Sequence, residues 1–162
     1  EGVVLFESGD FKLSEPKALN KSEQKFLQKK DFEFWFQKAQ AFKKDYQHNL
    51  EDGEFNNAAF HLHQIAEALY VAVLLVTTGY KPKTHNLEKV ENIVLEFVPE
   101  LKGVFPKETQ EQKRMFDLLK SSYTDARYLQ DFEIGRKELD YLFLCVQRLE
   151  DFVYTACSRI MN

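Results

Sequence analysis

The sequence predicts an all-α protein, an antiparallel up-and-down bundle of four to five helices with a short extended N-terminal segment. Apolar residues recur at steps of three and four over most of the chain, the spacing of an amphipathic helix. Pro and Gly are sparse, with 4 and 6 among 162 residues. The predicted connections are short, which favours antiparallel neighbours. The length and the 44% hydrophobic content fit one domain with a full core.

The N-terminal segment differs from the rest of the chain. Residues 3–6 form a short β-like run, residues 7–10 a turn, and residues 11–13 a second extended stretch. A lone hairpin of this size is marginal in water. We therefore expect residues 1–19 to be the tail of a preceding domain plus a linker, and residues 20–162 to be the helical bundle. The chain also opens at Glu1 without an initiator Met, so we expect a fragment of a longer protein.

The first helix should run from about Ser22 to Asp52. Phe34 and Phe36 widen its apolar stripe, so we expect it to contact neighbours on two sides. The residues that define the stripe are Phe32, Trp35, Ala39, Phe42 and Tyr46.

The second helix is expected from Glu54 to Thr78, with Gly79 as a left-handed stop. Beyond Ile65 it is apolar almost all round, which predicts the central helix of the bundle. Its longest apolar run, residues 68–76, is shorter than the 18 to 20 residues or so of a membrane span. Asn86 should cap a third helix that ends near Pro99.

A fourth helix is expected to carry Met115, Leu118, Leu119, Ser122 and Tyr123 on its inner side and to end near Ala126. The last helix follows a break at residues 131–135. Its stripe is Leu139, Leu142, Val146, Leu149, Val153, Ala156 and Ile160.

Charge and cysteine content narrow the functional classes. The net charge of −4 argues against broad nucleic-acid binding, which usually needs a basic face, but it leaves room for a local nucleotide pocket. Cys145 and Cys157 should lie about 18 Å apart on one helix, so they cannot pair within it. We expect reduced thiols in a cytoplasmic protein, with neither a membrane span nor a secretory signal.

The first candidate site lies at the start of the second helix. His63 and Glu67 share a face at i and i+4, with Gln64 beside them, whereas His61 and His63 point about 200° apart and cannot share a metal. The pair is either a satisfied polar contact at the bundle surface or the polar wall of a ligand cleft.

The second candidate is the loop 81–86. Lys81, Lys83, His85 and a helix N-terminus all favour an anion there. The alternative is a solvated loop in which Asn86 only caps the helix.

The third candidate is the segment 123–128. Asp125 and Arg127 are too close in sequence to face each other, so Arg127 would reach a carboxylate or phosphate elsewhere. A structural ion pair, for example with Glu67, is the alternative. The sequence shows neither a Gly-rich phosphate loop nor a zinc motif, and nothing requires a metal or an intrinsic cofactor.

Together the segments 58–67, 79–87 and 123–128 resemble the HEPN domain in order and spacing, and the resemblance covers the chain from about Phe32 to the C-terminus. Residues 2–6 also resemble the closing strand of a minimal nucleotidyltransferase domain of bacterial type, which often precedes HEPN. The resemblance implies a helical bundle, commonly a dimer, that binds nucleotide or helps the transferase to hold its substrate.

The family also contains ribonucleases, including toxins paired with nucleotidyltransferase antitoxins, that use an Arg followed by a His after four to six intervening residues. Every Arg here follows the last histidine, His85, so this motif is absent. Ribonuclease activity is therefore disfavoured, and transferase chemistry would need residues upstream of Glu1.

The first hypothesis is a non-catalytic accessory domain that binds a nucleotide, such as a nucleoside triphosphate, for a transferase domain in the same parent chain. Lys83 and Arg127 would neutralise phosphate, and His63 and Tyr128 would contact the base. The second is a dimerisation and docking module without a ligand, and the third is the ribonuclease. The expected ligand-binding residues are His63, Gln64, Glu67, Lys83, His85, Asp125, Arg127 and Tyr128.

Overall fold

The computed structural model describes residues 19–129 and 131–161, and these residues form helices without a strand. The expected domain boundary and hairpin at residues 1–19 fall almost entirely outside the described residues. The helices are α1 (Lys21–Glu51), α2 (Phe55–Thr78), α3 (Leu87–Phe97), the 3-10 helix η1 (Pro99–Leu101), α4 (Gln110–Ser121), α5 (Asp125–Tyr128) and α6 (Arg136–Met161).

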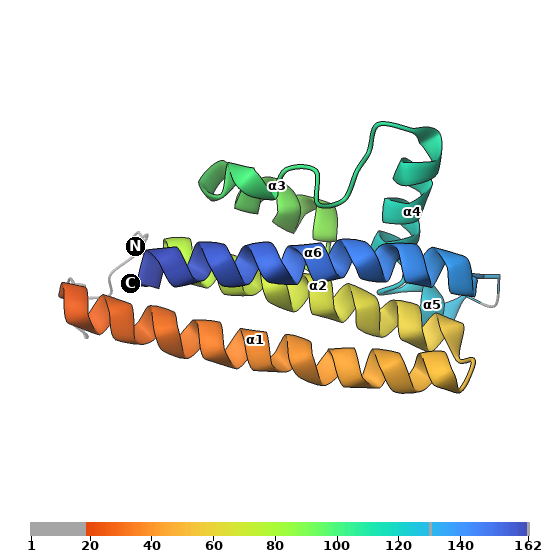
Figure 1. The fold of residues 1–162 in the computed structure, drawn as a ribbon, viewed down its shortest axis with the longest axis horizontal. Helices are drawn as coiled ribbons and strands as arrows, with labels where there is room; N and C mark the ends of the chain where they lie inside the picture. The colour runs from red at the N-terminus through yellow and green to blue at the C-terminus, as the bar shows by residue number, and fades with distance from the viewer. Residues whose placement is uncertain (1–18, 130, 162) are drawn as a thin grey trace, which may run out of the picture.

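Three long helices, α1, α2 and α6, lie side by side and form the body of the bundle (Figure 1). The α1–α2 pair is an antiparallel hairpin with a turn at Gly53, whose φ is +75°. The chain passes through α3, α4 and α5 before it enters α6. As a result α6 runs parallel to α2, in the same direction (Figure 1). The all-helical bundle is confirmed, and its short helices cover one side and one end of the long ones.

Helix α2 is the central helix, as its all-round apolar sequence predicts. Every residue from 65 to 74 is buried, and α2 packs against α1, α3, α4, α5 and α6. By length and composition α2 could cross a membrane, but 78% of its most apolar window is buried inside the protein. That burial is expected of the core helix of a soluble protein.

Local capping signals mark several helix ends. Asn20 and Glu23 form a capping box at the start of α1, and Asn86 accepts a hydrogen bond from the Lys89 amide at the start of α3. Gly79 ends α2 with φ of +68°, in the left-handed region that glycine adopts without strain. The predicted stop and cap around the 80–86 loop are therefore confirmed.

The fourth helix is shorter than expected. It ends at Ser121, and the residues up to Tyr128 form a turn and the separate one-turn helix α5. The buried Ser122 hydroxyl contacts the carbonyl oxygens of Leu119, at 2.8 Å, and Ala59, at 3.0 Å. This side-chain contact with α2 holds the chain at the point where α4 ends.

The apolar stripes of α1 and α6 mostly face the core. Phe36 stacks on Phe32 with ring centroids 5.2 Å apart and also approaches Tyr154 of α6, so the expected second contact side of α1 is confirmed. Phe34 instead remains 60% exposed. At the end of α6, Ile160 is 40% exposed, although its position in the stripe predicts burial.

Candidate functional site

A pocket of about 430 Å³ opens beside the loop that joins α2 to α3. It is lined by Glu67, Lys81, Pro82, Lys83, Thr84 and His85. Two of the three sequence candidates, the start of α2 and the 81–86 loop, therefore contribute to one hollow. Its volume lies within the range of small-molecule sites.

The loop is held at both ends by the helices it connects. After Gly79, the Tyr80 amide donates to the Thr78 hydroxyl at 3.0 Å. At the other end, the Asn86 amide donates to the Thr84 hydroxyl at 3.2 Å, and α3 begins at the next residue. Because both anchors are local, the loop presents its side chains in a defined arrangement.

The centre of the site is a hydrogen-bonded pair, Glu67 and His85. Nδ1 of His85 lies 3.0 and 3.1 Å from the two carboxylate oxygens of Glu67. Since an ionised carboxylate only accepts, Nδ1 carries the donated proton. Glu67 is 6% exposed, whereas the side chain of His85 is 55% exposed. Glu67 therefore orients a histidine that remains open to the pocket.

His63 supports this pair from inside the protein. Its Nδ1 donates to the Leu119 carbonyl of α4 at 3.0 Å, and its Nε2 lies 3.5 Å from a carboxylate oxygen of Glu67. The shared face of His63 and Glu67 is confirmed. His63 is completely buried, however, so it lies neither at the bundle surface nor in the wall of the pocket. Its expected contact with a nucleotide base is wrong for this arrangement, because α4 covers the ring.

Glu67 stays ionised in spite of its burial. Burial acts to raise the pKa of Glu67, but hydrogen bonding and charge from His63 and His85 outweigh it, so that the pKa lies below the ordinary value. The inner wall of the pocket therefore carries one negative charge, on a carboxylate that faces His63 and His85.

Aromatic rings flank the site on two sides. Tyr123, in the turn after α4, stacks on His85 with ring centroids 4.5 Å apart and an interplanar angle of 12°. On the other side, Lys81 lies over the ring of Trp35 of α1 at 4.3 Å, and Lys38 lies over the same ring at 4.8 Å. The sequence places Tyr123 in the third candidate segment without predicting its stack on His85, and it predicts Trp35 only as a core-facing residue, so the proximity of Trp35 to the pocket was missed.

The third sequence candidate lies on α5, which packs against α2. The Asp125 carboxylate accepts a hydrogen bond from the Thr124 hydroxyl at 2.8 Å. The backbones of Arg127 and Tyr128 belong to α5, but their side chains lie outside the described part of the structure, so their expected roles stay predictions.

Gln64 is half-buried on α2, and it is not among the residues that line the pocket. Within residues 19–129 and 131–161, no group of three or more His, Cys, Asp or Glu side chains could hold a metal ion.

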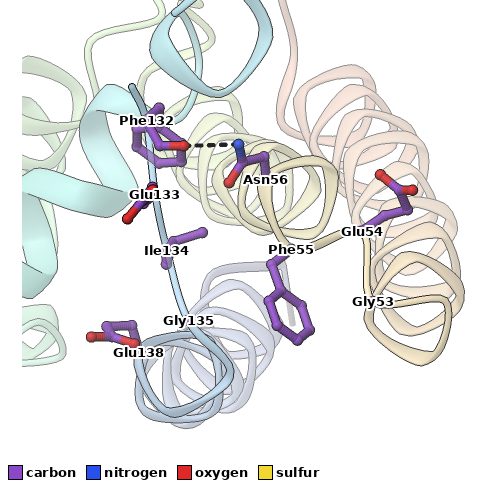
Figure 2. A pocket seen from close by; sticks show the side chains of 9 residues that line it. All are labelled: Gly53, Glu54, Phe55, Asn56, Phe132, Glu133, Ile134, Gly135 and Glu138. Atoms are coloured by element: carbon purple, nitrogen blue, oxygen red, sulfur yellow. Dashed lines mark hydrogen bonds between the residues drawn. The ribbon is translucent and has the colours of Figure 1, made fainter. Parts of the chain in front are cut away.

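A larger hollow of about 700 Å³ lies at the end of the bundle where α1 turns into α2 (Figure 2). The Asn56 side chain donates to the Phe132 carbonyl at 2.9 Å across its inner edge. Its charged residues are the three carboxylates of Glu54, Glu133 and Glu138. An acidic wall disfavours phosphate, and the sequence candidates for ligand binding lie elsewhere.

Comparison with known protein families agrees with the resemblance seen in the sequence. The family described as the HEPN domain matches residues 32–156, from the middle of α1 almost to the end of α6. No curated protein matches the chain.

Proposed function

Because this chain belongs to the HEPN domain family, we propose that it is a non-catalytic domain that binds a nucleotide through its phosphate groups in the pocket beside the 80–86 loop. In this proposal it serves as the accessory domain of a minimal nucleotidyltransferase carried by the same parent chain. The ligand is held by loop residues, and the transferase would supply the chemistry.

The observation that carries this proposal is the convergence of Lys81, Lys83 and His85 on one hollow. Ammonium groups and protonated imidazole rings donate charge-assisted hydrogen bonds to phosphate oxygens. The N-terminus of α3 follows directly after His85 and adds partial positive charge. This local arrangement favours an anion even though the whole chain has a net charge of −4.

The negative charge of Glu67 does not defeat anion binding. Both of its carboxylate oxygens face Nδ1 of His85, and one also faces His63. An incoming phosphate would meet the two lysines and the open ring of His85. Glu67 would then act by fixing and polarising His85, as a carboxylate does for a histidine in many sites.

The test is calorimetric titration of the chain with a panel of nucleotides, with Lys83→Ala beside the parent. Lys83 is exposed and lines the pocket, so its loss should weaken binding by about 1.5 to 3 kcal/mol, the scale of a charge-assisted contact. Lys137→Ala is the matched control, because it removes an exposed lysine of α6 that does not line the pocket. It should leave binding unchanged.

Two results would refute the nucleotide site: no heat with any nucleotide, or equal affinity of Lys83→Ala and the parent. The role of Arg127 is tested in the same series with Arg127→Ala. Recovery of unaltered nucleotide after prolonged incubation, checked by mass spectrometry, is expected for a non-catalytic domain.

A second candidate function is docking or dimerisation without a ligand. Its support is the apolar surface on α1, where Phe26 is 69% and Phe34 is 60% exposed. Phe36 does not belong to this exposed surface, because its ring packs against Phe32 and Tyr154. Sedimentation at high micromolar concentration tests self-association, and a strict monomer would count against it.

A further inference from the structure

This inference rests on the proposed nucleotide site. We infer that the pocket selects a terminal phosphate in its dianionic form, and that His85 takes up a proton as this ligand binds. The ligand class is thus a phosphate monoester, as in a nucleoside monophosphate, and not a phosphodiester.

The geometry around His85 prepares it to become a cation. Its Nδ1 is bound to both carboxylate oxygens of Glu67, which is 6% exposed and so is shielded from water. Within the described residues, Nε2 of His85 has no hydrogen-bond partner, so it is the atom that would receive the proton and then donate it to a ligand oxygen.

Tyr123 supports the same charge from the face of the ring. It stacks nearly parallel to the His85 imidazole at 4.5 Å, within the distance at which an aromatic face attracts a cation. The stacking covers one face of His85 and leaves the ring edge for hydrogen bonding.

The charges that line the pocket match a dianion only after this proton arrives. Lys81 and Lys83 contribute two positive charges and Glu67 one negative charge, a sum of +1. A phosphodiester carries one negative charge and would be neutralised without any change. A phosphate monoester, whose second pKa is about 6, carries two, so a protonated His85 completes the balance.

Other ionisable groups lie on α2 and on the elements that pack against it. They are His63 of α2 behind Glu67, Tyr123 after α4, the Glu88–Lys120 pair that links α3 to α4, Asp125 at the start of α5, and Lys38 of α1 on the Trp35 ring. Among the residues known to contact His85, only Glu67 is ionised at neutral pH, so we assign the proton uptake to the Glu67–His85 pair.

The experiment compares adenosine 5′-monophosphate with 3′,5′-cyclic adenosine monophosphate, which share base and sugar but differ as monoester and diester. Both are titrated calorimetrically at pH 7.5 in two buffers of different ionisation enthalpy, so that proton uptake appears as a difference in heat. The monoester should bind at least about tenfold more tightly than the diester, a difference on the scale of one charge-assisted contact. The heat of monoester binding should also depend on the buffer. His85→Gln should abolish the buffer dependence and reduce the preference to less than about threefold.

His48→Gln is the control, since His48 is an exposed histidine of α1 paired with Asp52 at 3.5 Å, and it does not line the pocket. It should behave like the parent. Far-ultraviolet circular dichroism shows whether each variant is folded, and the comparison of the two ligands on the parent chain needs no variant.

The outcomes separate this inference from the proposed function. If no nucleotide binds, the nucleotide site and the inference both fall. If monoester and diester bind equally, or the heat of monoester binding is the same in both buffers, the nucleotide site stands and the inference fails. Retention of the buffer dependence in His85→Gln would equally overturn the assignment to His85.

Discussion

Replacing Glu67 by Gln should destabilise the protein strongly at neutral pH and hardly at all in acid. The carboxylate accepts from His85 at 3.0 Å and lies 3.5 Å from His63, at 6% exposure. The change removes one charge-assisted hydrogen bond, on the scale of about 1.5 to 3 kcal/mol. Because His85 is half-exposed, water screens part of this interaction, and we expect a loss of about 2 kcal/mol in the free energy of unfolding.

The pH dependence follows from the lowered pKa of Glu67 in the folded protein. The unfolded chain binds the proton at the ordinary glutamate pKa, about 4.3, whereas the folded chain binds it only at lower pH. The contribution of the carboxylate is therefore fully present above that value and is lost as the pH falls through the folded pKa. In strong acid residue 67 is neutral in the parent and in Glu67→Gln alike, and the two side chains have nearly the same shape.

The assay is urea unfolding followed by circular dichroism at several pH values between 7 and 3. At pH 7 the difference of about 2 kcal/mol should lower the melting temperature by roughly 4 to 8 °C for a chain of this size. Glu96→Gln, an exposed change on α3, should stay within about 0.5 kcal/mol of the parent. A gap of equal size at pH 7 and pH 3 would show that the loss comes from packing and not from charge, and it would refute the reasoning.

Two further predictions concern other buried groups. Lys107→Ala should cost about 3 kcal/mol in urea unfolding, because Glu91 is 4% exposed and would keep only the Tyr70 hydroxyl, at 3.3 Å, as a described partner. Cys145 and Cys157 are buried, and burial raises the pKa of both thiols, that of Cys157 to about 12; a thiol reagent at pH 8 should therefore modify them only when the protein unfolds.

Each of these two predictions would be contradicted by a simple result. Lys113→Ala removes an exposed lysine of α4 and should be nearly neutral; if Lys107→Ala were equally neutral, the buried pair with Glu91 would contribute nothing to stability. Modification of either cysteine in the native protein at the rate of a free thiol would mean that its helix opens far more readily than the packing indicates.

The parts of the fold that depend on local chemistry could be predicted from the sequence. Gly79 and Asn86 mark helix ends by their own backbone and side-chain properties, so their positions were correct. The end of α4 could not be predicted in this way. The end of α4 coincides with the contact between the Ser122 hydroxyl and the Ala59 carbonyl, two residues that are 63 positions apart in the sequence. Helical periodicity contains no signal for a contact between such distant residues.

The same distinction applies to the site. The i to i+4 spacing correctly placed His63 and Glu67 on one face of α2. It could not show whether that face meets solvent or another helix, and α4 buries His63 completely. The stack of Tyr123 on His85 joins two turns far apart in sequence, and only the tertiary arrangement reveals it.

The start of α1 and the end of α6 lie at the same end of the bundle (Figure 1). From Lys21 to Trp35, which Lys81 contacts at 4.3 Å, the helix rises about 21 Å. A fully extended chain covers that distance with about six residues. A partner domain tethered at this end of the bundle, before α1 or after α6, by even a short flexible linker would therefore meet the pocket as an intramolecular neighbour, at an effective concentration of order millimolar.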